Sequence, residues 1–184
     1  MALVVLLRGV NVGGHRRFRP ARLAEQLGHL GCTNIGATGT LVIRQHINRT
    51  QLRDEVASRL PFETGIVICQ GREILRLLSG EFFAGFPLRP DMVRFVSFLS
   101  RVPRAEPKLP MRLPSHGKWL LKVLARDGRF VVGVYRRDTK VIGYLGTLDR
   151  VFGVPLTTRN WNTITAIGRV LDGGETSRGK SDVA

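Results

Sequence analysis

The feature of this sequence that most restricts its fold is an order of predicted elements that occurs twice along the chain. A continuous apolar run over residues 2–7 predicts a buried strand, because a strand covered on both faces needs no polar alternation. The segments that follow predict a helix over 21–30, two short strands or one kinked strand over 33–44, a helix capped by Thr50, and a strand over 65–69. The first half therefore has the order β-α-β-β-α-β.

The second half repeats this order without its first helix. After a short helix over 72–79 we expect a strand over 92–99, and a proline-rich stretch over 103–114 replaces the missing helix or contains only fragments of it. Asp127-Gly128 favours a type I′ hairpin turn. The elements around and beyond this turn are strands over 118–126 and 129–136, a helix over 138–152, a brief strand over 154–156 and a helix over about 161–171.

Two tandem units of this order predict an α+β protein with two ferredoxin-like (β-α-β-β-α-β) subdomains, each an antiparallel sheet with helices on one face, plus a C-terminal helix. The alternative is a single mixed sheet, since the two halves have no residue-level similarity. We expect one two-lobed domain over residues 1–172, with lobes over about 1–80 and 90–172. The polar, glycine-rich tail over 173–184 is expected to be disordered.

The chain is strongly basic, with 29 Lys and Arg residues against 14 Asp and Glu, a formal net charge of +15. Such a charge favours attraction to polyanions and carries no information about the fold. Most of the basic residues are Arg, whose guanidinium suits phosphate and carboxylate groups. The alternative is that the arginine excess reflects a genome rich in Arg codons.

Cysteine usage and hydropathy indicate a cytoplasmic protein. Cys32 and Cys69 stand alone, with no spacing that suits a metal or a redox motif, so no metal or cofactor is expected. Unpaired cysteines suit a reducing compartment. The N-terminal apolar run is too short for a signal peptide, and no stretch reaches the length of a membrane span, so we expect no membrane partner.

The segment that directly follows the first strand, residues 8–14, is the first candidate anion-binding loop. Its glycines, including Gly13 and Gly14, allow backbone N–H groups to approach an anion, and Arg8 and Asn11 can donate beside them. The spacing matches neither a Walker A loop nor the dinucleotide-binding pattern. The alternative, which the residue types alone favour, is a turn with left-handed residues in which Asn11 bonds to its own backbone.

Residues 157–163 form the second candidate loop, which we expect to open the last helix. A helix start leaves backbone N–H groups free and carries partial positive charge, and Thr158, Arg159, Asn160 and Asn162 add donors to it. The alternative is that Thr158 or Asn160 only caps the helix while Trp161 packs on the core. The two interpretations are compatible, because a capping residue can share its N–H groups with a ligand.

These two segments also carry a family resemblance. Leu-Leu-Arg-Gly-Val-Asn-Val-Gly-Gly near the N-terminus and Thr-Thr-Arg-Asn-Trp-Asn-Thr near the C-terminus resemble the family of domain of unknown function 1697, over about residues 2–171. The resemblance implies a soluble, bacterial, two-lobed α+β protein with ferredoxin-like subdomains. It implies no established activity, cofactor or catalytic residue.

The chain departs from this family at two positions. Members usually read Ile-Gln-Ser-Gly-Asn before the third strand, where this chain has Gly-Ala-Thr-Gly-Thr over residues 36–40. Members also tend to carry Ser-Lys at the start of the helix before the C-terminal motif, where Val141-Ile142 stand here. If those polar residues form a family site, the resemblance implies that this protein uses an altered one.

A third feature is the strand predicted over 118–126, which places Lys118, Lys122 and Arg126 at period two on one face. A basic sheet face with exposed aromatic residues can bind single-stranded nucleic acid. No motif typical of such sheets accompanies the pattern, so a solvated basic face is the favoured alternative.

We expect the two candidate loops to line one cleft between the lobes that holds a phosphate-bearing or other anionic ligand. The first alternative is an enzyme that acts on a nucleotide or phosphoester in the same cleft. It would need an acid/base that the sequence does not identify, since His116 is a lone loop histidine. The second is a basic module that binds nucleic acid or another partner without catalysis. A shared cleft requires that residues 8–14 and 157–163 face each other.

Overall fold

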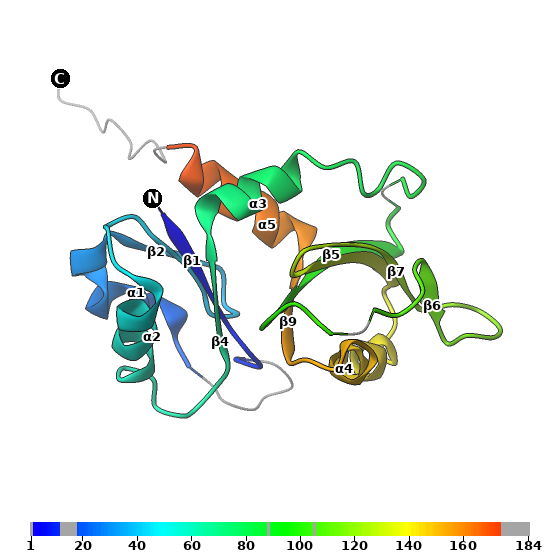
Figure 1. Cartoon of the computed structure of the whole chain (residues 1–184), viewed down its shortest axis with the longest axis horizontal. Coiled ribbons are helices and arrows are strands. Elements are labelled where there is room, and N and C mark those ends of the chain that lie inside the picture. The colour runs from blue at the N-terminus through cyan, green and yellow to red at the C-terminus, as the bar shows by residue number, and fades with distance from the viewer. Residues whose placement is uncertain (1, 12–17, 88, 105, 174–184) are drawn as a thin grey trace, which may run out of the picture.

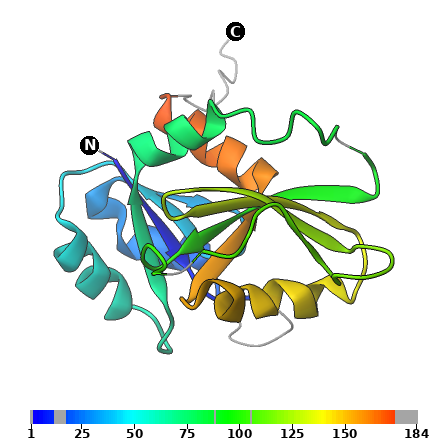
Figure 2. The same ribbon diagram turned by 45° about the vertical axis from the view of Figure 1, so that its right-hand side comes forward.

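The computed structural model of the chain describes residues 2–11, 18–87, 89–104 and 106–173, which contain two antiparallel sheets (Figures 1 and 2). The first sheet has the order β2-β3-β1-β4, with β1 (Leu3–Leu7), β2 (Cys32–Ile35), β3 (Thr40–Ile43) and β4 (Ile66–Gln70). The second has the order β6-β7-β8-β5-β9, with β5 (Met92–Leu99), β6 (Met111–Leu113), β7 (Leu121–Asp127), β8 (Phe130–Arg136) and β9 (Leu156–Asn160).

Helices cover the outer faces of both sheets and bridge them. They are α1 (Pro20–Gln26), the 3-10 helix η1 (Gly28–Leu30), α2 (Arg49–Ala57), α3 (Gly71–Leu78), α4 (Val141–Phe152) and α5 (Trp161–Leu171). In Figure 1, α1 and α2 flank the first sheet and α4 lies below the second. The helices α3 and α5 pack side by side across the top of both sheets (Figures 1 and 2).

Strand β1 is buried on both faces, which explains its continuous apolar run. Its side chains alternate between two clusters, as the pleat of a strand requires. Leu3, Val5 and Leu7 pack with α1 and α2, whereas Val4 and Leu6 belong to a different cluster on the opposite face. A polar residue at any of these positions would be buried without a partner.

The cluster around Val4 and Leu6 is a core that both sheets share. The second sheet contributes Phe98 and Phe130, whose rings meet edge to face with centroids 5.5 Å apart. The helices α3 and α5 close the same cluster from above, and a third cluster lies between the second sheet and α4. The predicted lobes over 1–80 and 90–172 stay a prediction, and residues 174–184 of the tail lie outside the described residues.

The α+β class with antiparallel sheets is confirmed, and so is the hairpin at Asp127-Gly128, which joins β7 to β8 with Gly128 at φ 58°. Two local predictions are wrong. The cap of α2 is Asn48, whose side chain accepts from the Gln51 N–H, rather than Thr50. The last strand covers Leu156–Asn160 instead of 154–156. The proline-rich stretch replaces the missing helix, as expected, and the described part of it contains the short strand β6, which pairs with β7.

Two glycines offer a matched test of this packing. A Cβ on Gly133 in β8 would lie 2.3 Å from the Lys122 carbonyl oxygen and 2.6 Å from the Phe95 ring, whereas one on Gly146 in α4 would meet no atom within 4 Å. We expect Gly133→Ala to lower the free energy of unfolding by about 1–3 kcal/mol through overpacking. Gly146→Ala should raise it by about 0.5–1 kcal/mol, because Ala stabilises a helix interior. Urea denaturation measures both, and an equal effect of the two substitutions would contradict this packing.

Candidate functional site

Arg159 belongs to the second candidate loop, and the structure places its side chain in the interior, 6% exposed. The residue lies in β9, not in a loop, and its side chain reaches across to the first sheet. Its nitrogens donate to six oxygen atoms: Nε to Thr40 Oγ1 at 2.7 Å, Nη1 to Thr157 Oγ1 at 2.8 Å and the Thr158 carbonyl at 2.9 Å, and Nη2 to the carbonyls of Leu7 and Thr38, both at 2.8 Å, and of Gly39 at 3.4 Å.

These contacts use the full donor capacity of the guanidinium, since an arginine side chain has five N–H groups. Burial lowers the pKa of Arg159 to about 10, which still leaves the group charged at neutral pH. No N–H remains for a ligand. We therefore interpret Arg159 as a residue that joins the two sheets, which differs from the ligand contact expected from the sequence.

The other buried polar side chains of the described part belong to the same network. They are Thr40, Ser97 and Thr157. Thr157 Oγ1 donates to the Leu7 carbonyl at 3.3 Å, and the hydroxyls of Ser97 and Thr158 lie 2.7 Å apart. The C-terminal motif therefore meets the end of β1 directly, through hydrogen bonds and without an intervening cleft at this point.

The first candidate loop is held to the same region. Arg8 forms an ion pair with Asp149 and donates through Nε to the Leu156 carbonyl at 3.1 Å, while its side chain stays 46% exposed. Asn11 has φ 56° and bonds to the backbone of Phe18 and Ala37. Asn11 therefore stabilises a turn, as the alternative interpretation states. Its side chain bonds to the backbone of Phe18 and Ala37 instead of its own backbone. Gly13 and Gly14 lie outside the described residues.

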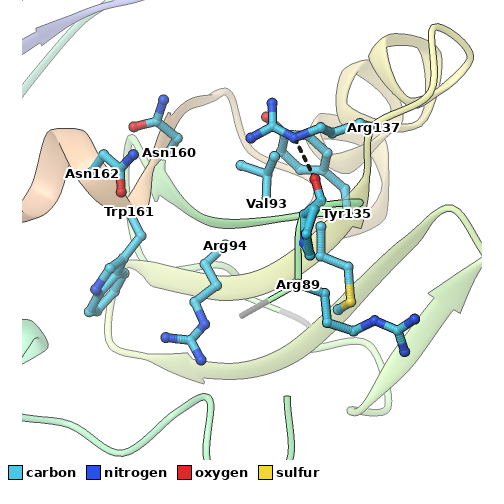
Figure 3. Close-up of a pocket in the computed structure, with 10 residues that line it drawn as sticks. Arg89, Val93, Arg94, Tyr135, Arg137, Asn160, Trp161 and Asn162 are labelled. Atoms are coloured by element: carbon cyan, nitrogen blue, oxygen red, sulfur yellow. Dashed lines mark hydrogen bonds between the residues drawn. The ribbon is translucent and has the colours of Figure 1, made fainter. Parts of the chain in front are cut away.

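The remaining residues of the C-terminal motif, Asn160 and Asn162, lie at a separate cavity of about 470 Å³ at the start of α5 (Figure 3). Asn160 caps this helix, because its Oδ1 accepts from the Thr163 N–H at 2.9 Å. Trp161 packs edge to face on Phe83, with ring centroids 4.9 Å apart. The other lining residues come from β5, β8 and their ends: Arg89, Pro90, Met92, Val93, Arg94, Tyr135 and Arg137.

Three arginines give this cavity, which we call the α5 pocket, a positive charge. Arg137 Nε donates to the Pro90 carbonyl at 3.0 Å, and Figure 3 shows its guanidinium pointing toward the side formed by Asn160 and Asn162. Among the described residues, none accepts from its terminal nitrogens. Arg89 lies 3.3 Å from a carboxylate oxygen of Asp91.

Arg94 completes the pocket from within β5. Its Nη2 donates to the Phe86 carbonyl at 2.8 Å, and its guanidinium lies over the Phe83 ring at 4.8 Å. Its Nε is buried and has no hydrogen-bond partner in the described part of the chain. Burial also raises the pKa of Tyr135, so its hydroxyl is neutral at pH 7 and can donate a hydrogen bond.

Sequence reasoning did not single out Arg89, Arg94 and Arg137 as site residues. Arg94 carries a signal that could have found it, because it is charged and lies inside the otherwise apolar run of β5. Arg89 and Arg137 follow no motif. They reach the pocket because the strand ends bring them together, which a single sequence does not reveal.

The basic face predicted from Lys118, Lys122 and Arg126 does not form. A β-bulge between Val123 and Ala125 shifts the register of β7, so Lys122 and Arg126 point to opposite faces of the sheet. Arg126 pairs with Glu106 at 2.7 and 2.8 Å, which lowers the pKa of that carboxyl. Lys118 precedes the strand.

The aromatic residue nearest these side chains is also occupied. The Trp119 ring has Lys122 Nζ at 4.7 Å and the Arg136 guanidinium at 4.4 Å from its centroid. These two cations would compete with a nucleic-acid base for the ring. Nucleic-acid binding stays a prediction without a site in this sheet.

Comparison with known proteins shows a family and a fold. The family described as "Protein of unknown function (DUF1697)" matches residues 1–113, and the chain belongs to this family. A solved structure with the same fold is that of the conserved bacterial protein SP0830 from Streptococcus pneumoniae, at 16% identity and a TM-score of 0.57, covering 92% of this chain and 98% of that one. No curated protein matches the sequence.

Two structural features are absent from the described part of the chain. No helix there is both long and apolar enough to cross a membrane. Within the same ranges, no group of three or more His, Cys, Asp or Glu side chains is arranged to hold a metal ion.

Replacement of Arg159 tests its structural role. We expect Arg159→Met to lower the free energy of unfolding by about 3 kcal/mol or more, since each buried acceptor that loses its donor costs roughly 1–3 kcal/mol. The control is Arg169→Met, on an exposed position of α5, which should change stability by less than about 0.5 kcal/mol. Chemical denaturation of both variants measures the difference, and similar stabilities would refute the bridging role.

Proposed function

We propose that the protein binds a small phosphate-bearing or other anionic ligand, and that the α5 pocket is the binding site. The observation that carries this proposal is that Arg89, Arg94 and Arg137 line one cavity together with the amides of Asn160 and Asn162. Figure 3 shows Arg137 on the same side of β5 as the two amides, and the guanidinium groups of Arg94 and Arg89 on the other side. Its volume of about 470 Å³ falls within the usual range for small-molecule sites.

The helix start strengthens the attraction for an anion. The N–H groups of Trp161 and Asn162 lie in the first turn of α5, where no carbonyl of the helix can accept from them, and the helix dipole adds partial positive charge. Asp91 is the acidic residue that pairs with Arg89, and it also binds Arg136 at 2.6 Å. Asp91 is thus shared with Arg136, which lies outside the pocket lining, and it does not compensate the three arginines of the pocket.

The walls of the pocket favour a ligand that is only partly polar. Met92, Val93, Tyr135 and Trp161 line it beside the arginines. A phosphate or carboxylate held by the guanidinium groups would leave the rest of such a ligand against aromatic and aliphatic side chains. A phosphorylated compound with a planar or apolar part satisfies both requirements.

The proposed ligand class is the one expected from the sequence, but the proposed binding site is a different one. Of the predicted site residues, Asn160 and Asn162 line the α5 pocket, whereas Arg8 lies elsewhere and Arg159 has no free donor. The enzyme alternative, an activity on a nucleotide or phosphoester, would use the same pocket and requires turnover that binding alone does not.

We also infer that each lobe is a ferredoxin-like subdomain. In the first lobe the support is the order β2-β3-β1-β4 with α1 and α2 as the connecting helices. In the second, β7-β8-β5-β9 has the equivalent order, with α4 as the second helix and β6 in place of the first. This relation supports the tandem repeat predicted from the order of elements.

A binding panel with a matched pair of variants tests the proposed function. Inorganic phosphate, nucleoside monophosphates and sugar phosphates are titrated by calorimetry at low salt, and at least one organic phosphate should bind in a saturable way. Arg137→Gln should weaken that binding by about 10- to 100-fold, the loss of a charge-assisted hydrogen bond. Arg72→Gln, which removes the same charge from an exposed position of α3, should leave it within about twofold.

Two results would reject the α5 pocket as the site. One is the absence of saturable binding across the panel, and the other is an equal effect of Arg137→Gln and Arg72→Gln, which would indicate a general response to charge. Incubation of the bound compound with the protein, followed by product analysis, separates binding from the enzyme alternative.

A further inference from the structure

A second cavity, of about 410 Å³, lies between the two sheets at the opposite end of β9 from the α5 pocket. Four arginines from three parts of the chain line it: Arg8 after β1, Arg49 and Arg53 on α2, and Arg129 at the β7–β8 turn. We call it the arginine cleft. Four like charges around one cavity repel each other unless anions compensate them.

Within the described ranges of the chain, two carboxylates pair with these four arginines. Asp149 pairs with Arg8. Glu73 lies 3.4 Å from Arg49 and 3.9 Å from Arg129. Arg53 has no acidic partner among the described residues, so the cleft retains an excess of two positive charges.

Two of these guanidinium groups are fixed by the free edge of the first sheet. Strand β4 is an edge strand, and its Ile66 and Ile68 carbonyls point away from β1. They accept from Arg53 Nη1 at 2.7 Å and Arg129 Nη2 at 3.2 Å. A carbonyl holds a guanidinium in place without neutralising it, so the charge of both arginines remains available.

We propose that the arginine cleft is a second anion-binding site, built for a phosphate group. Guanidinium groups that are already held by backbone carbonyls lose little conformational entropy when an anion binds. No hydrogen bond to another described residue occupies Arg53 Nη2 or Arg129 Nη1, and each arginine can present its remaining N–H groups to phosphate oxygens. This site is independent of the α5 pocket, and it recovers the role that the sequence suggests for Arg8.

The proposal is tested by an NMR titration of the 15N-labelled protein with pyrophosphate as the probe. Saturable shifts are expected for the amides of Val67, Ile68 and Arg129. Arg49→Gln should weaken this binding at least tenfold, because it removes an exposed charge that lines the cleft. Arg72→Gln again serves as the charge-matched control, and Arg137→Gln should leave these shifts unchanged, which separates this site from the α5 pocket.

A second variant changes the affinity in the opposite direction. Glu73→Gln removes the carboxylate that competes for Arg49 and Arg129 but keeps a side-chain oxygen to accept from the Gln70 N–H, which Glu73 Oε2 now does at 2.6 Å. We expect severalfold tighter pyrophosphate binding. The proposal is overturned if the shifts near Ile68 do not saturate, if Arg49→Gln and Arg72→Gln act alike, or if Glu73→Gln fails to strengthen binding.

Discussion

The relative position of the two sheets depends on the buried guanidinium of Arg159. The core between the sheets is apolar, and apolar contacts are not directional, so they would tolerate small sliding of one sheet on the other. The six hydrogen bonds of Arg159 are directional, and four different segments supply their acceptors: β1, the β2–β3 turn, β3 and β9 itself. A shift of either sheet would leave several buried acceptors unsatisfied.

This network also fixes β9, on which both basic cavities depend. The strand pairs with β5 on one side and sends Arg159 into the first sheet on the other. Its first residue, Leu156, lines the arginine cleft, and its last, Asn160, lines the α5 pocket. Four residue steps along a strand span about 13 Å. The two proposed sites therefore share one strand, which contributes one residue to each of them at its two ends.

Much of the fold could be predicted from the sequence, because the informative signals are local. The apolar run of β1, the helical spacing of α1 and the Asp127-Gly128 turn each reflect the environment of neighbouring residues. The bounds of β9 could not be predicted correctly, because this strand lacks a local signal. Its Thr-Thr-Arg-Asn sequence shows neither apolar alternation nor an apolar run, since its polar side chains are buried by partners distant in sequence.

The candidate site was harder to predict, because the same residue types serve structure and binding. An arginine among threonines and asparagines is typical of an anion site, and nothing local reveals that the acceptors of Arg159 lie about 120 residues earlier, at Thr38 and Thr40. Asn160 and Asn162 were identified from the helix start, which is a local feature. Their arginine partners come from strand ends that only the folded chain brings together.

Hydrogen bonds from arginine side chains to backbone carbonyls give the large positive charge of the chain a structural explanation. Several arginines donate to backbone carbonyls at a strand edge, at a helix end or in a loop: Arg44 to Val170, Arg53 to Ile66, Arg94 to Phe86 and Arg129 to Ile68. Buried carbonyls need donors, and a long guanidinium can reach them from a distant element. Since a carbonyl leaves the charge of its donor in place, a fold stabilised in this way accumulates positive potential in its cavities.

Attraction for anions then follows from how the fold is held together. Selectivity must come from the groups with free donors, above all Arg137 in the α5 pocket and the remaining N–H groups of Arg53 and Arg129 in the arginine cleft.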